Sequence, residues 1–226
     1  MNFLSQTLTV AAKDLRSELR TKESLNAAAA FAIVILLLFS FAIDPNGEQV
    51  AELSGGILWI VFSFAGALIL NRSFARELAN DCLDALVASP VSGAALFLGK
   101  ALANFTLILL VELVSLPVFG IFYDLRWNRQ PEWLALVLVL ATWGMTVIGT
   151  MFSALTVNLR LRELMLPMLV YPMMIPVLMS AMQLTTLLIS GNPIAGDDFL
   201  WLRLLAGFDI IFTSLSLALV EVVLVG

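Results

Sequence analysis

The sequence predicts an all-α membrane protein with six transmembrane helices and an amphipathic helix before them. Of the 226 residues, 61% are hydrophobic and 13% are charged, and the mean hydropathy is +0.99, whereas about a quarter of a soluble domain is charged. A helix needs about 20 mainly apolar residues to cross the hydrocarbon core. Continuous blocks of this kind, without period-two alternation, exclude an outer-membrane barrel. We expect one domain, residues 1–226, with spans at 26–43, 54–70, 94–122, 134–157, 164–190 and 204–225.

Residues 1–25 are predicted to form an amphipathic interfacial helix. One helical stripe holds Leu4, Leu8, Leu15 and Leu19, and the opposite side holds Lys13, Arg16 and Arg20. This pattern favours a helix lying in the cytoplasmic membrane interface, with its apolar side toward the lipid acyl chains and its basic side toward headgroups and water. A groove on a soluble partner is the alternative. Because no small-residue cleavage site follows the first apolar run, we interpret that run as a retained anchor.

Lys and Arg residues are distributed unequally between the two predicted sides of the membrane. Nine fall on one side: Lys13, Arg16, Arg20, Lys22, Arg72, Arg76, Lys100, Arg160 and Arg162. Three fall on the other: Arg126, Arg129 and Arg203. Because cytoplasmic loops are enriched in these residues, the bias places both termini in the cytoplasm.

The longest predicted cytoplasmic connection, residues 71–92, has its own helical pattern. Phe74, Leu78, Cys82 and Ala85 form an apolar stripe, and Glu77, Asp81 and Asp84 form an acidic stripe beside it. Pro90 ends the pattern. Two interpretations fit this periodicity equally: a solvated connector resting on the bundle, or a docking helix for a cytoplasmic protein.

The residue types that most enzymes need are missing. The chain has no histidine, which removes the commonest general base, metal ligand and proximal haem ligand. Cys82 is its single cysteine, so an internal disulfide and a cysteine zinc site are both excluded. No Gly-x-x-x-x-Gly-Lys-Ser/Thr segment is present, and ATP binding in the P-loop manner is therefore not expected. We predict a non-catalytic chain that holds no metal or cofactor of its own.

Acidic residues inside the apolar blocks are candidate functional groups. Glu112 lies near the middle of the third span, Asp209 in the first part of the sixth, and Glu221 near the end of the sixth. Such residues are costly in a bilayer and normally face protein or water. Glu112 is either functional or hydrogen-bonded across helices, for example to neighbours such as Thr106 or Ser115 or to a partner subunit. Asp209 could pair with Arg203 or cap a broken helix.

The fifth span combines three prolines with six methionines. Pro167, Pro172 and Pro176 each remove a backbone donor, so we expect this helix to be kinked or broken. Broken helices often line cavities or moving parts, but passive packing is equally compatible with the pattern. Methionine can ligate haem iron, yet it is also an adaptable apolar filler, and we favour packing.

The pattern Arg72-x-Phe74-x-x-Glu77-x-x-x-Asp81-x-Leu83-Asp84-x-Leu86-x-x-x-Pro90, followed by Lys100, resembles the cytochrome c maturation protein B family, also called haem exporter protein B. The resemblance extends to the basic amphipathic start, to Gly55-Gly56-Ile57-Leu58-Trp59, and to Tyr171-Pro172-Met173-Met174-Ile175-Pro176. It covers essentially the whole chain. Asp81-Cys82 stands where the family often has Gly-Ser, and Asp84 replaces a glutamate, which keeps the charge but shortens its reach.

The resemblance implies the membrane permease subunit of an ABC transporter with the six-span ABC-2-type exporter architecture. It implies a separate cytoplasmic ATPase that binds ATP, the C and D membrane proteins of cytochrome c maturation, and a second membrane half from a homodimer or heterodimer. Haem is the implied cargo, or a haem-loaded chaperone is what ATP hydrolysis releases. The residues implied to couple to the ATPase are Arg76, Glu77, Asp81, Leu83, Asp84 and Pro90.

Two other functions compete with this interpretation. The same architecture could export a different cargo, such as a drug, a lipid or a polysaccharide. A different class is an ion-coupled carrier with Glu112 as its proton site, or a membrane scaffold. A carrier is expected to show paired intramembrane charges or inverted repeats, and the sequence shows neither.

Overall fold

The computed structural model describes residues 2–43, 48–74, 91–125, 127, 129–156 and 162–225, and within these ranges every long element is a helix. In chain order these are α1 (Phe3–Thr21), α2 (Glu23–Ala42), α3 (Glu48–Leu70), α6 (Gly93–Tyr123), α7 (Pro131–Thr156), α8 (Arg162–Ile189), the short 3₁₀ helix η1 (Gly196–Asp198) and α9 (Phe199–Val225).

Six of the described helices, α2, α3, α6, α7, α8 and α9, are long and apolar enough to cross a membrane. This confirms the predicted fold class and the position of every predicted span. The largest differences are at two helix starts, because α3 begins at Glu48 rather than at residue 54 and α9 begins at Phe199 rather than at residue 204. Polar first turns such as Glu48-Gln49 continue a helix without adding to its hydropathy.

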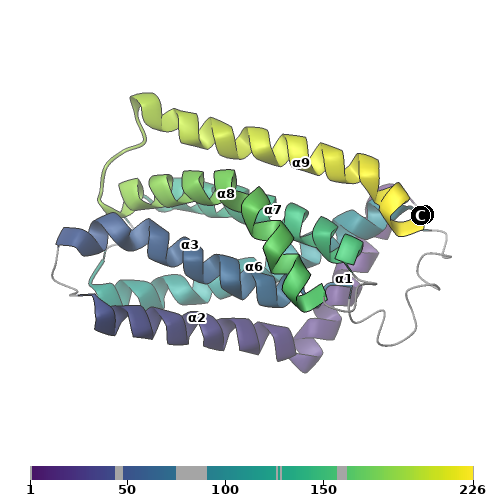
Figure 1. Cartoon of the computed structure of the whole chain (residues 1–226), viewed down its shortest axis with the longest axis horizontal. Coiled ribbons are helices and arrows are strands. Elements are labelled where there is room, and N and C mark those ends of the chain that lie inside the picture. The colour runs from purple at the N-terminus through teal and green to yellow at the C-terminus, as the bar shows by residue number, and fades with distance from the viewer. Residues whose placement is uncertain are drawn as a thin grey trace.

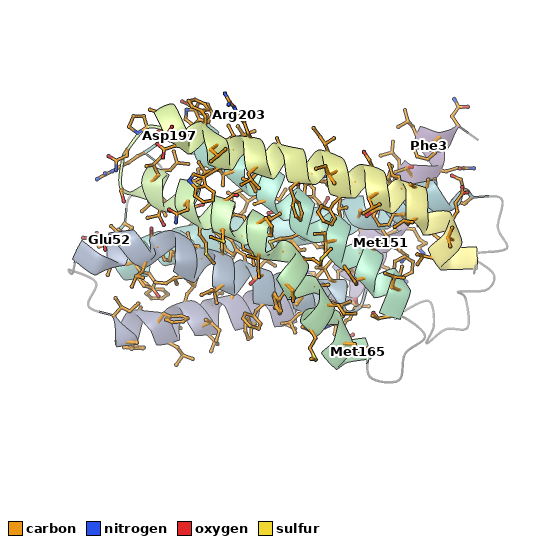
Figure 2. All side chains as sticks on the ribbon, turned by 45° about the horizontal axis from the view of Figure 1, so that its top comes forward. Phe3, Glu52, Met151, Met165, Asp197 and Arg203 are labelled. Atoms are coloured by element: carbon orange, nitrogen blue, oxygen red, sulfur yellow. The ribbon has the colours of Figure 1, made fainter. Side chains whose placement is uncertain are left out.

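The bundle has two enclosed helices and a looser outer set. In Figure 1, α2 and α9 form opposite sides, with α3, α6, α7 and α8 between them. α3 and α7 are the most enclosed of the six. Phe3 and the C-terminus lie at one end of the bundle, and Glu52, Asp197 and Arg203 lie at the other (Figures 1 and 2). Arg203, which the sequence assigns to the outer side of the membrane, therefore lies at the opposite end from the start of α1, which the sequence assigns to the cytoplasmic side.

α1 lies across one end of the bundle (Figure 1) and packs mainly along α6. The face it presents to the bundle consists of Thr7, Val10, Ala11 and Glu18, whereas Leu4, Leu8 and Leu19 are exposed. Contact is close because Gly99 of α6 has no side chain, and a Cβ there would lie 2.6 Å from Val10 Cβ and 2.8 Å from the Thr7 carbonyl oxygen. The sequence predicted an apolar side and a basic side for this helix. The structure adds a third side, which packs against the rest of the protein.

The turn between α1 and α2 is made by a single residue. Lys22 ends α1 and begins α2 with a φ of 55°, so the chain bends sharply there. The buried Glu18 carboxylate then accepts hydrogen bonds from the backbone N–H groups of Ser24 and Leu25, at 2.8 and 2.9 Å. These N–H groups belong to the first turn of α2 and have no partner within the helix. α1 is thus joined to the start of the first span by a carboxylate cap.

Glu18→Ala is expected to destabilise the protein by about 1–2 kcal/mol, because two buried N–H groups lose a charged acceptor. Glu18→Gln keeps an acceptor and should cost less. Glu23→Ala is the matched control, since the Glu23 carboxylate is exposed and pairs with Arg72 at the surface, where ion pairs are worth about 0–1 kcal/mol. Thermal unfolding of purified protein in detergent measures all three. Equal losses for Glu18→Ala and Glu23→Ala would contradict the capping role.

Candidate functional site

The residues predicted to couple to an ATPase, Arg76, Glu77, Asp81, Leu83, Asp84 and Pro90, lie outside the described residues. The chain is described immediately before them, through Phe74, and immediately after them, from Val91. We call residues 71–74 the loop root, because they connect α3 to the predicted docking segment. The contacts of the loop root determine which helices would move with it if the predicted docking segment were displaced.

The loop root forms a tight turn directly after α3, and its last residue, Phe74, has a buried side chain. The N–H groups of Arg72 and Ser73 donate to the carbonyls of Ile69 and Leu70, both at 3.1 Å. Phe74 is completely buried and packs with Ala154 of α7 and Val223 of α9. The loop root is therefore fixed to the cytoplasm-assigned ends of two further spans.

Lys100 of α6 holds the loop root from the other side. Its side chain is 1% exposed. Nζ donates to the carbonyl oxygen of Ser73 at 2.7 Å and to Asp14 Oδ2 of α1 at 3.1 Å. It also lies 4.7 Å from the centre of the Phe74 ring, within reach of a cation–π contact. A buried ammonium needs several such partners to offset its lost hydration, so the three contacts fix the side chain in one place.

Asn104 extends this cluster one helical turn further along α6. Its Nδ2 donates to Ser73 Oγ at 2.8 Å and to Thr150 Oγ1 of α7 at 3.0 Å. The loop root is consequently bonded directly to α6 through Lys100 and Asn104. These two side chains link it onward to Asp14 of α1 and Thr150 of α7, and Arg72 adds an exposed ion pair with Glu23 of α2. Asp14, Ser73 and Asn104 were not among the residues singled out from the sequence. The available signal was the four-residue spacing of Lys100 and Asn104 on one face of α6.

The same α6–α7 contact continues to Glu112. This residue is completely buried, and the Thr142 hydroxyl of α7 lies 2.7 and 2.8 Å from its two carboxyl oxygens. The separation from Asn104 to Glu112 on α6 and from Thr142 to Thr150 on α7 is eight residues in each case. The antiparallel helices thus keep one register, with polar groups paired at both positions. Thr106 and Ser115, the neighbours considered for Glu112, instead donate to carbonyls of their own helix.

Asp209 is the other buried acid in the spans. Its carboxyl group lies against α7, and a Cβ added to Gly144 would be 2.7 Å from Asp209 Oδ1. Within the described part of the chain, neither carboxyl oxygen has a hydrogen-bond partner. The pair with Arg203 that the sequence suggested does not form. Arg203 instead lies at an apolar groove between α8 and α9, together with Pro172, Pro176 and Phe208.

α8 passes through Pro167, Pro172 and Pro176 as one continuous helix rather than a broken one, and Figure 1 shows it bending in its first half. Pro172 and Pro176 face outward into the α8–α9 groove. Of the six methionines, Met174 is buried and Met182 half-buried, while the rest are exposed: Met165, Met168, Met173 and Met179. The bend of α8 therefore presents a methionine-rich surface to the surroundings of the chain.

Comparison with known proteins gives one consistent result. The model of the CcmB protein family matches residues 5–221. The chain is 33% identical to a heme exporter protein B of Rhodobacter capsulatus over 76% of this chain and 78% of that one. It is 32% identical to the protein of that name from Paracoccus denitrificans, over 74% and 76%. For Pseudomonas aeruginosa the identity is 31% over 88% of both chains. The chain belongs to the CcmB protein family.

Proposed function

We propose that this chain is the membrane permease subunit of an ABC transporter that acts in cytochrome c maturation. Its relatives are named heme exporter protein B, and its six spans match a permease. Because the sequence has no P-loop, ATP is bound and hydrolysed on a separate cytoplasmic chain. The complex either exports haem or uses ATP hydrolysis to release the haem-loaded chaperone.

The observation that supports this proposal best is the bonding of the loop root. A segment whose root is tied to α6 by buried polar contacts, and through Lys100 and Asn104 to α1 and α7, is suited to receive a movement and pass it to the spans. Rigid elements joined by such contacts are how coupling between sites is physically transmitted. The ATPase therefore docks on residues 75–90, with Arg76, Glu77, Asp81, Leu83 and Asp84 in the contact and Pro90 ending the segment.

The remaining parts of the complex follow from the same proposal. Both termini and residues 75–90 are cytoplasmic, in a bacterial inner membrane, as the Lys/Arg bias indicates. A second membrane subunit, either another copy or a different chain, completes the transporter. The C and D proteins of cytochrome c maturation are its membrane partners.

Copurification from native membranes tests the proposal. A C-terminally tagged chain is expected to retain an ABC ATPase and the maturation proteins, and Asp84→Lys is expected to lose the ATPase alone. Reversing a charge at a docking surface places like charges together and costs several kcal/mol. Asp197→Lys is the matched control, because this exposed aspartate lies at the opposite end of the bundle from Phe3 of α1 (Figure 2).

Absence of any ATPase from the wild-type sample, even after crosslinking, would contradict the permease function. Loss of the ATPase in both variants would instead show that charge reversal disturbs the whole protein. Retention in both would leave the permease function intact and remove Asp84 from the docking contact.

A further inference from the structure

We infer that Lys100 is a positioning residue that couples the interfacial helix α1 to the ATPase-docking segment, so that α1 moves together with the loop root. This inference rests on the proposed function and adds a second path for the movement.

The first step of the argument is that Lys100 joins two segments that are far apart in the sequence. Its Nζ donates to the Ser73 carbonyl at 2.7 Å and to Asp14 Oδ2 at 3.1 Å. Ser73 is two residues before the docking segment, and Asp14 is on the side of α1 that faces the bundle. One ammonium group therefore bridges α1 and the loop root directly.

The second step is that this bridge is protected from water. The Lys100 side chain is 1% exposed and that of Asp14 is 19% exposed. Charged contacts at such sites are much less weakened by solvent than surface pairs. The Asp14 carboxylate also accepts from Lys13 at 3.1 Å, but the Lys13 side chain is half exposed. Because the Lys100 side chain is buried and held in one position, a displacement of Asp14 or Ser73 is passed on through Lys100 rather than through Lys13.

The third step is that α1 is itself fixed to the start of the first span. Glu18 accepts hydrogen bonds from the first turn of α2, and Gly99 allows α1 to lie against α6. A displacement of the loop root would thus reach the N-terminal end of α2 through α1. The bridge makes α1 part of the coupling path and not only an attachment to the membrane surface.

Complementation of a strain that lacks its own heme exporter protein B tests the inference. Four variants are compared: Lys100→Met, Asp14→Asn, Asp14→Glu and Lys13→Met. The readouts are the yield of c-type cytochrome in cells, the amount of ATPase that copurifies, and the thermal unfolding midpoint in detergent. Lys100→Met keeps the length and apolar stem of the side chain but removes the hydrogen bonds to Ser73 and Asp14.

Lys100→Met and Asp14→Asn are expected to keep the ATPase bound and to lower the cytochrome yield by about fivefold or more, as for coupling between distant sites. Asp14→Glu keeps the carboxylate and should restore the yield, and Lys13→Met should leave it unchanged. Asp14→Asn carries the test if Lys100→Met does not fold.

Wild-type yields from both Lys100→Met and Asp14→Asn would overturn the inference. Loss of the ATPase from folded Lys100→Met would also overturn it, because Lys100 would then belong to docking rather than transmission. Failure of the proposed function is distinguishable, since the wild-type chain would then neither copurify an ATPase nor restore cytochrome.

Discussion

Gly55→Ala is expected to destabilise the protein by about 1–3 kcal/mol or more, the usual cost of forcing atoms into a packed interior. A Cβ at this position would overlap the Met182 carbonyl oxygen and the Thr186 hydroxyl oxygen of α8. The Gly55 N–H also donates to Thr186 Oγ1 at 3.1 Å. The Met182 carbonyl oxygen is a backbone atom and cannot rotate out of the way as a side chain could. The added methyl group therefore forces α3 and α8 apart. Thermal unfolding in detergent measures the loss.

Gly56→Ala is the matched control for this substitution. It lies one residue further along α3, and a Cβ there meets nothing within 4 Å. Alanine is about 1 kcal/mol better than glycine inside a helix, so Gly56→Ala should leave the midpoint unchanged or raise it. A similar fall of the midpoint in both variants would contradict the role assigned to the α3–α8 contact.

The Gly55 contact gives a physical account of part of the sequence pattern that suggested the family. Trp59 follows Gly55 by one helical turn, and its Nε1 donates to Thr185 Oγ1 of α8 at 2.9 Å. The glycine lets the two helices approach, and the tryptophan fixes their rotation. Both residues therefore serve the packing of α3 against α8.

The spans were predictable because membrane helices have a strong one-dimensional signal. Each must be apolar over about 20 residues whatever it packs against, so the six blocks correspond to α2, α3, α6, α7, α8 and α9. The resemblance at residues 72–100, combined with the basic amphipathic start and the patterns at 55–59 and 171–176, indicated the family that the comparison shows. The residues assigned to ATPase docking remain predictions, since they lie outside the described ranges.

The contacts between spans were not predictable from hydropathy. A helix that is apolar all round carries no stripe to show which side faces protein, and lipid is as apolar as leucine. The information lies in small and polar residues, such as Gly99 against α1 and Thr142 against Glu112. For this reason Thr106 and Ser115, close in sequence to Glu112, were considered before the true partner thirty residues away.

Thr142→Val is expected to destabilise the protein by about 1–3 kcal/mol or more, although it changes the side-chain volume very little. The substitution removes the hydroxyl that lies within hydrogen-bond distance of both Glu112 carboxyl oxygens. A buried polar group left without its partner costs its full desolvation penalty, about 1–3 kcal/mol, and more when the group is charged. Thermal unfolding in detergent measures the change.

Thr146→Val is the matched control, one turn further along α7 and equally buried. The Thr146 hydroxyl donates to the Thr142 carbonyl of its own helix, and that carbonyl keeps its place in the helix when the hydroxyl is lost. We expect a change of about 0.5–1.5 kcal/mol at most, the net worth of an ordinary hydrogen bond.

Glu112→Leu combined with Thr142→Val is expected to recover most of the stability that Thr142→Val loses, because replacing both partners by apolar groups leaves nothing unsatisfied. Glu112→Gln keeps an acceptor for Thr142 and should resemble wild type in both stability and cytochrome yield. These two results together would make Glu112 an interhelical link between α6 and α7. A stable Glu112→Gln protein that supports no cytochrome formation would contradict this role. Such a result would mean that position 112 needs an ionisable side chain, as the ion-coupled carrier with Glu112 as its proton site requires.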